Sequence, residues 1–251
     1  MAVNKQYIKE MKKKFGGYNA TWLPGVPLNV GDIGVFDKDG GFDKKANLKH
    51  LNINFEILQD HTGDELEYSS KGSVSIIPKL SGKPLPSCGL EIGEAGVAIE
   101  FSKQNSVVFK AKNVTYPSIA NQIQLEKDIA KLYHQGEWKK EWCVVTELAV
   151  AESATILISK SSNSKIELKA NANLNAAQID IADVSFNFSV KSEKDVSTKF
   201  IAQHGLTPLF KAQKLNLKGS LKRQKTAPAN DVAEDMALTA FVFSEEENQL
   251  V

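Results

Sequence analysis

The fold of this chain is decided by residues 165–190, which read KIELKANANLNAAQIDIADVSFNFSV. From Ile166 to Ala176, apolar side chains at every second position alternate with polar ones. A second alternating run extends from Val184 to Val190. A period of two places successive side chains on opposite faces of a β-strand. The pattern therefore predicts two strands of about eleven and seven residues, in an antiparallel sheet with one face in water.

The same alternation allows a second interpretation. A strictly alternating strand of about 9–11 residues is long enough to cross a bilayer as part of a transmembrane β-barrel. The apolar side chains would then face lipid after insertion and cover the core before it, while the polar ones would face the lumen. The apolar set is Leu168, Leu174, Phe186 and Phe188, and the polar set is Glu167, Asn171 and Asn187.

The rest of the chain shows further strands and only two helical stripes. The spacing of Tyr7, Met11 and Phe15 predicts a short helix over 4–15, and that of Leu125, Ile129 and Leu132 a second one over 118–135. Strands are predicted at 28–36, 69–80, 97–101, 107–110 and 142–148, with a hairpin turn at 37–41. The expected fold class is α+β, with a long twisted antiparallel sheet and a few peripheral helices.

Charge is divided unevenly along the chain. The net charge of the 251 residues is only +1, which argues against nucleic acid as a partner. Residues 1–225 contain 31 basic and 24 acidic side chains, whereas 226–251 contain six acidic side chains and no basic one. We expect a basic domain at 1–221, an exposed linker at 222–230, and an acidic tail at 231–251 that docks through the apolar run from Ala237 to Phe243.

No arrangement of residues indicates an enzyme, a cofactor or a metal site. The four histidines are scattered, and neither a nucleophile elbow nor a phosphate-binding glycine loop is present. Residues 37–41 do not begin a calcium loop, because Leu48 stands where the bidentate Glu is needed. The two cysteines, Cys88 and Cys143, suit a reducing cytosol, and Cys143 lies in a predicted core strand.

Neither a signal peptide nor a long apolar run is visible in the sequence. We therefore expect the resting protein to be soluble and cytoplasmic.

Six short segments follow one another in an informative order. They are YIK (7–9), WLP (22–24), PLNVGD (27–32), SKGSVSI (70–76), WCVVTEL (142–148) and GLTPLFKA (205–212). In this order they resemble the pore-forming domain of gasdermins, particularly the bacterial ones, over about residues 4–218.

The resemblance implies a protein of cell death and antiphage defence that is stored as an autoinhibited monomer. An activating protease would release it, and it would then oligomerise into a large β-barrel pore in acidic membranes, moving from the cytoplasm to the cell membrane. By position, the lipid-binding lysines would be Lys9, Lys12, Lys13 and Lys14, and the inserting hairpins would lie near 73–110 and 155–200.

The acidic tail is the expected off-switch. Its anchor would be Phe241, Val242 and Phe243, and the cleavage linker would contain Lys222, Arg223 and Lys225. Docking of six negative charges would offset the net charge of +7 on residues 1–225 and mask part of the basic surface.

Two departures from the gasdermin pattern keep alternatives open. The first cysteine is Cys88, so the N-terminal region lacks the lipid-bearing cysteine of bacterial gasdermins. The second hairpin carries Lys160, Lys165 and Lys169, which would have to face a lumen or an interface. The rival expectation is a soluble β-rich binding or assembly module that does not insert. A third alternative is an enzyme whose site the sequence does not reveal.

Overall fold

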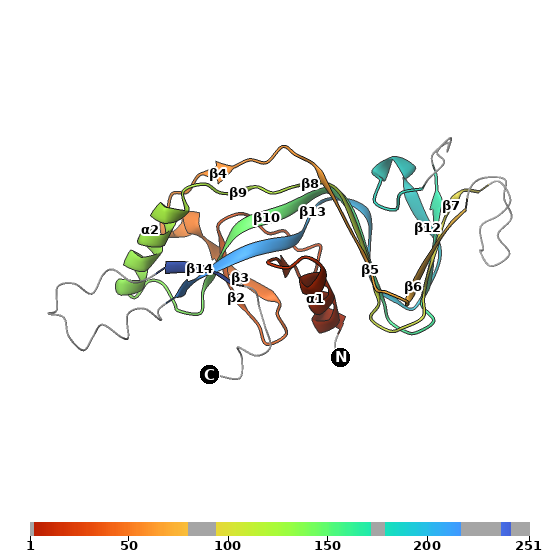
Figure 1. The fold of residues 1–251 in the computed structure, drawn as a ribbon, viewed down its shortest axis with the longest axis horizontal. Coiled ribbons are helices and arrows are strands. Elements are labelled where there is room, and N and C mark those ends of the chain that lie inside the picture. The colour runs from red at the N-terminus through yellow and green to blue at the C-terminus, as the bar shows by residue number, and fades with distance from the viewer. Residues whose placement is uncertain (1–2, 80–93, 172–178, 217–236, 242–251) are drawn as a thin grey trace.

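The computed structural model describes residues 3–79, 94–171, 179–216 and 237–241, which form mostly antiparallel β-sheet (Figure 1). These residues contain the helices α1 (Val3–Lys14) and α2 (Gln122–His134) and the short 3-10 turns η1 (Leu48–Leu51) and η2 (Val184–Phe186). The strands are β1 (Asn19–Ala20), β2 (Asp32–Phe36), β3 (Phe42–Asn47), β4 (Ile57–Leu58), β5 (Asp64–Ser69), β6 (Val74–Lys79), β7 (Gly96–Phe101), β8 (Val107–Thr115), β9 (Ser118–Ile119), β10 (Cys143–Ser159), β11 (Lys165–Ala170), β12 (Phe188–Lys194), β13 (Val196–Asn216) and β14 (Ala237–Phe241). The expected α+β class, with an antiparallel sheet and peripheral helices, is confirmed at that level.

Strands β10 and β13 form the centre of the larger sheet. They pair antiparallel over nearly the whole length of β10. On the other side of β10, β2 pairs near its start, β9 near its middle, and β8 along its second half. Strand β3 extends the sheet from β2, and β5 extends it from β8. Strands β1 and β14 pair with β13.

A smaller sheet continues the larger one beyond a sharp bend. Its strand order is β6-β7-β11-β12. Along the chain these four strands are neighbours of β5, β8, β10 and β13, respectively, which lie in the same order in the larger sheet. The four connections, at 70–73, 102–106, 160–164 and 195, are called the bend from here on. Figure 1 shows them at the lower right, where the ribbons turn back upward. The arrangement amounts to two long hairpins that lie side by side and that both turn sharply at the bend.

Serine hydroxyls replace the ladder hydrogen bonds that the strands lose at the bend. The hydroxyl of Ser70 accepts from the backbone N–H of Val107 at 2.9 Å, and that of Ser159 accepts from the N–H of Ser106 at 2.8 Å. Buried backbone groups without a partner are destabilising, so these hydroxyls allow the sheet to fold sharply. Gly72 has a φ of +65°, a conformation in which other residues are strained.

The apolar core has three parts. The first lies between α2 and the end of the larger sheet that contains β2, with Leu125 and Ile129 of α2 fully buried. The second lies between α1 and the middle of the larger sheet, where Tyr7 and Met11 pack with Phe109. The third includes side chains from both sheets and fills the angle between them. Together the three parts hold both helices and the smaller sheet against β8, β10 and β13.

Both predicted helices exist, with one shifted boundary. Helix α1 agrees with the predicted 4–15 to within one residue at each end. Helix α2 begins at Gln122 and not at 118, because Ser118 and Ile119 form β9 and pair with β4 and β10. The predicted hairpin turn at 37–41 is confirmed, since the N–H of Asp37 donates to the carbonyl of Gly41 at 2.8 Å.

The alternating strand predicted over 184–190 is wrong in its first half. Residues Val184–Phe186 form η2, and Asn187 follows in the left-handed conformation with a φ of 43°. The carboxylate of Asp183 accepts a hydrogen bond from the N–H of Ser185 at 2.9 Å, which stabilises the turn in place of a strand. Strand β12 starts only at Phe188.

The expected separation of polar and apolar faces in 166–176 also fails where the structure describes it. In β11, Glu167 is buried as well as its neighbours Ile166 and Leu168. The carboxylate of Glu167 accepts a hydrogen bond from the hydroxyl of Ser192 at 2.8 Å and lies 3.0 Å from the ammonium group of Lys165. Glu167 is buried because β11 is a central strand between β7 and β12. The two polar partners compensate for the burial of its charge.

Part of the predicted tail is ordered as a strand. Strand β14 lies antiparallel to β13, with Ala237 opposite Asn216 and Phe241 opposite Ala212. The predicted linker at 222–230 and the tail residues after 241 lie outside the described residues.

Substitution of Ile156 should test the central position of β10. Ile156 is fully buried between β8 and β13, so Ile156→Ala should lower the free energy of unfolding by about 2–5 kcal/mol through lost burial and a cavity. Ile123 is 77% exposed on α2, and Ile123→Ala should change stability by less than about 0.5 kcal/mol. Urea denaturation of both variants measures the difference. Equal losses would contradict the assignment of the core.

Candidate functional site: a basic groove beside α1

A groove of about 940 Å³ separates α1 from the bend. One wall is the side of α1 that carries Gln6, Glu10, Lys13 and Lys14. The other wall comes from the turns at 70–73 and 102–106 and the end of β5, and it includes Tyr68, Ser70, Lys71, Lys103, Asn105 and Ser106. We call this feature the basic groove.

Four exposed lysines surround the basic groove: Lys13 and Lys14 on α1, and Lys71 and Lys103 on the bend. Two carboxylates, Glu10 and Glu67, also line it, so positive charge is in excess. One of these carboxylates already has two donors, because Glu10 accepts hydrogen bonds from the hydroxyl of Tyr68 and from the side-chain amide of Gln6 at 2.6 Å. The groove therefore favours an anion.

The floor of the groove is polar. The hydroxyl of Ser106 donates to the carbonyl of Lys103 at 3.0 Å, and its oxygen lies 2.9 Å from that of the Ser73 hydroxyl. Ser73 and Ser106 are both buried. The hydroxyl of Ser73 likewise donates to the carbonyl of Ser70 at 3.1 Å, so the donors that the groove offers to a phosphate or carboxylate group are the ammonium groups at its rim.

The contact between Tyr68 and Glu10 fixes α1 to the sheet. Partial burial, and then the hydrogen bond to Glu10, raise the pKa of Tyr68 to about 12. On another side of α1, the ammonium group of Lys5 lies 3.1 Å from the carboxylate of Asp39 in the hairpin turn between β2 and β3. These polar contacts add to the apolar contacts of Tyr7, so the lysines of α1 have a fixed position relative to the larger sheet.

The structure brings only part of the predicted lysine set together. Lys13 and Lys14 line the groove, whereas Lys9 is exposed on α1 away from the lining and Lys12 is half-buried. Lys71 and Lys103 were missed by the sequence analysis, because only the fold brings them to α1. The one sequence signal is that Lys103 lies between the predicted strands 97–101 and 107–110, whereas Lys71 lies beside Gly72 within the predicted strand 69–80, which the structure interrupts at 70–73.

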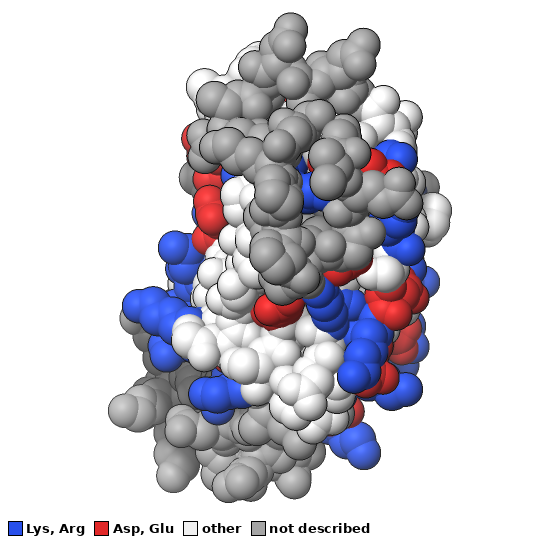
Figure 2. All heavy atoms as spheres, turned by 90° about the vertical axis from the view of Figure 1, so that its right-hand side faces the viewer, with Lys and Arg blue, Asp and Glu red and all other residues white. Residues whose placement is uncertain are grey.

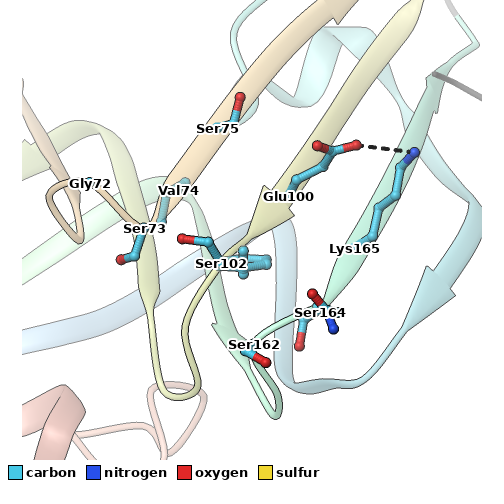
Figure 3. Close-up of a pocket in the computed structure, with 11 residues that line it drawn as sticks. Gly72, Ser73, Val74, Ser75, Glu100, Ser102, Ser162, Ser164 and Lys165 are labelled. Carbon is cyan, nitrogen blue, oxygen red and sulfur yellow. Dashed lines mark ion pairs between the residues drawn. The ribbon is translucent and has the colours of Figure 1, made fainter. Parts of the chain in front are cut away.

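A second depression, of about 620 Å³, lies at the bend, where β6 and β11 begin and β7 ends (Figure 3). Serines surround it, and Lys165 extends toward Glu100, with 3.3 Å between the charged groups. Lys165 also pairs with Glu167, and this hydrogen bond is the main reason that its pKa is raised. Since this lysine faces two carboxylates, the depression has no excess of positive charge.

The smaller sheet also carries ion pairs. Lys169 lies 2.7 Å and Lys191 3.5 Å from the carboxylate of Glu94. Figure 2, which views the molecule from this end, shows lysines and carboxylates interspersed along the sides of an uncharged area. Among the residues that line the basic groove, four are lysines and two are glutamates.

The described residues that were predicted to insert into a membrane lie close together, since Leu168 and Phe188 share the third part of the core. Leu168 and Phe186 are buried and Phe188 is half-buried, with 5.6 Å between the centroids of the two phenylalanine rings. Phe241 is the last residue of β14. The remaining predicted residues lie outside the described part of the chain: Leu174, Lys222, Arg223, Lys225, Val242 and Phe243.

The described residues contain no group of three or more His, Cys, Asp or Glu side chains that could hold a metal ion. Cys143 is buried, as expected, and burial raises the pKa of its thiol to about 12. This thiol is therefore protonated and unreactive at neutral pH. Cys88 lies outside the described residues.

Neither a family model nor a curated protein matches this chain. In the described part of the chain, no helix has both the length and the hydropathy to cross a membrane.

Removal of one hydroxyl should test how α1 is held. Tyr68→Phe should lower the free energy of unfolding at pH 8 by about 1 kcal/mol, because it removes the hydrogen bond to Glu10. A tyrosine with a raised pKa stabilises the fold below its ordinary pKa of about 10, and this contribution is lost as the pH rises through about 12. The variant should therefore lose less stability than the native protein between pH 10 and 12. Denaturant midpoints at several pH values measure this, and Tyr133→Phe on α2 is the control. Identical pH profiles for the native protein and Tyr68→Phe would contradict the assignment.

Proposed function

We propose that this protein is a membrane pore former with a gasdermin-like fold, and not an enzyme. It would be stored in the cytoplasm as an autoinhibited monomer, be released by a protease, bind acidic lipid at the cell membrane, and oligomerise there. The observation that supports this proposal most is the excess of lysine in the basic groove, beside two long hairpins that are folded at a single line.

The basic groove supplies the first step, which is attraction to a membrane. Each lysine near an acidic leaflet contributes about 1 kcal/mol, so Lys13, Lys14, Lys71 and Lys103 together could contribute several. This attraction would weaken as salt is added, because exposed charges are screened over about 10 Å at 0.1 M salt. The four lysines suit the phosphate and carboxylate groups of lipids better than an apolar ligand.

The two hairpins supply the second step. Strands β10 and β13 contain 17 and 21 residues, more than the roughly 9–11 that one crossing of a bilayer requires. Opening of the bend would join each of them to its continuation in the smaller sheet. Lys165 and Lys169 are each paired with a glutamate, so they could be carried into a lumen without leaving a charge unpaired.

The tail would supply the autoinhibition. Strand β14 occupies the edge of β13 from Ala212 to Asn216, an edge that a neighbouring molecule could otherwise use. Residues 226–251 carry six negative charges that oppose the basic body. Cleavage in the linker at 222–230 would lower the effective concentration of the tail, which favours its dissociation.

One observation favours the second candidate, a soluble binding or assembly module that does not insert. Ile166, Glu167 and Leu168 are all buried, so both faces of β11 are covered, as in the core of a protein that stays folded in solution. In this case the basic groove would bind an anionic partner in solution, and β14 would simply complete the sheet. A measurement of vesicle leakage separates the two candidates.

Neutralisation of the groove should abolish membrane binding. The variant in which Lys13, Lys14, Lys71 and Lys103 are all replaced by Gln should bind phosphatidylserine vesicles at least about a hundredfold more weakly, given roughly 1 kcal/mol per lysine. Cosedimentation at 0.1 M salt measures the affinity, and the thermal midpoint shows that the variant is folded.

A matched control separates the groove from the net charge. Lys127, Lys131, Lys139 and Lys140 are exposed on or beside α2, and their replacement by Gln removes the same charge. This control should bind as the native protein does. Equal losses for the two variants would show that net charge, and not the groove, determines binding.

Cleavage of the linker should start leakage. A specific protease site inserted within 222–230 should leave the protein inactive until it is cut, after which vesicles that contain a quenched dye should leak. Identical leakage before and after cleavage would remove the inhibitory role of the tail. Absence of leakage in both samples, with membrane binding retained, would favour the assembly module.

A further inference from the structure

Residues 179–187, between β11 and β12, fold back into the angle between the two sheets. Ile181 and Ala182 are buried, and Ile181 packs in the third part of the core. This part contains Val108 and Leu157 of the larger sheet as well as Ile166 and Leu168 of the smaller one. The segment therefore contacts both sheets, and we call it the clasp.

Four side chains of the larger sheet form a platform beneath the clasp. In the pairing of β10 with β8, Ser153 lies opposite Lys112 and Thr155 lies opposite Lys110. Because side chains two residues apart share one face of a strand, the four form a two-by-two square on a single face. The square holds two hydroxyls on β10 and two ammonium groups on β8.

The hydroxyls of the platform bind the backbone of the clasp. Ser153 donates to the carbonyl of Ala182 at 2.6 Å, and Thr155 donates to the carbonyl of Ile181 at 2.5 Å. The Thr155 hydroxyl also accepts from the N–H of Ala202 on β13 at 2.8 Å. Both hydroxyls are buried, so the loss of either would leave buried polar groups of the clasp without these partners.

The ammonium groups of the platform bind the two carboxylates of the clasp. Lys110 lies 3.2 Å from Asp180, and Lys112 lies 2.9 Å from Asp183 and 3.6 Å from Asp180. These side chains are between 19% and 29% exposed, so their attraction is less screened than that of a surface pair. Hydrogen bonds from Ser185 and then from Lys112 lower the pKa of Asp183 to about 2, which keeps it charged at neutral pH.

The sequence of the clasp matches the platform residue by residue. Asp180, Ile181, Ala182 and Asp183 present carboxylate, carbonyl, carbonyl and carboxylate in succession, and each meets a donor on the square. Local capping supports the conformation, since the N–H of Ala182 donates to the carboxylate of Asp180 at 3.0 Å. Such complementarity over four successive residues is more than packing of the angle requires.

We propose that the clasp, by binding this platform, is the element that keeps the smaller sheet folded onto the larger one, and that its release precedes extension of the second hairpin. The first part concerns the folded protein in solution. The second part rests on the proposed pore-forming function.

Hydrogen–deuterium exchange of the full chain in solution tests the first part. Lys112→Gln and Thr155→Val change the platform without changing the clasp, and each should speed exchange of the amides in 181–187 by about tenfold or more, as expected when a local opening loses one polar anchor. Lys112 is partly exposed, so its variant should fold even if Thr155→Val does not. As a control, Glu193→Gln removes the carboxylate that Lys199 contacts between β12 and β13, and it should leave exchange in 181–187 unchanged. Unchanged exchange in folded Lys112→Gln would overturn the proposal.

Vesicle leakage by the same variants tests the second part, after cleavage of the linker. Faster leakage by Lys112→Gln than by the cleaved native protein would support release as a step before extension. Faster exchange with an unchanged leakage rate would overturn that step. Faster exchange with no leakage from any sample, the cleaved native protein included, would support the clasp and count against pore formation.

Discussion

The pairing of β10 with β13 is the constraint on which the rest of the structure depends. Every other strand of the larger sheet attaches, directly or through one neighbour, to one of these two strands. Four shifts of register interrupt the pairing, and such irregularities increase the local twist and bending of a strand. One of them lies between Ala154 and Ile156, so Thr155 stands beside the irregularity and its hydroxyl reaches the backbone of β13. The clasp is thus bound to β10 itself, and the Thr155 hydroxyl that holds it also contacts β13.

The two sheets keep the same order of strands on both sides of the bend. A change in the angle between them would require no strand to exchange its neighbour, and the ladders of β10 with β13 and of β11 with β12 could stay intact. The bonds at risk are those of the serine hydroxyls at the four turns and those of the clasp. The resistance to such a change therefore lies in the apolar contacts of the third part of the core and in a few polar side chains, Ser70, Ser159, Thr155 and Lys112 among them, and not in the ladders within either sheet.

Local patterns in the sequence were sufficient to predict much of the fold. The stripe of Tyr7 and Met11 predicted α1, and the apolar run from Trp142 to Leu148 predicted the first part of β10. The prediction failed at Glu167 and at Val184–Phe186. A buried glutamate looks like a solvent-facing residue until its partners are known. Lys165 stands two positions away on the same strand, and Ser192 comes from the pairing of β11 with β12. The turn at 184 depends on capping by Asp183, which competes with a weak strand pattern. Only the lysines on the α1 side of the groove could be predicted, because it is the bend that brings Lys71 and Lys103 near Lys13 and Lys14.

The position of the basic groove links two equilibria. Lys13 and Lys14 move with α1, while Lys71 and Lys103 belong to the turns about which the smaller sheet would rotate. The spacing of the four ammonium groups is consequently a function of the angle between the sheets. An anion that binds one spacing more tightly than another shifts the equilibrium between the two angles toward the tighter one, by the difference in binding free energy. By thermodynamic reciprocity, a change from one angle to the other changes the binding free energy of the anion by the same amount. A polyvalent anion that spans both walls would exert the largest coupling, and a monovalent one that contacts a single lysine would exert almost none.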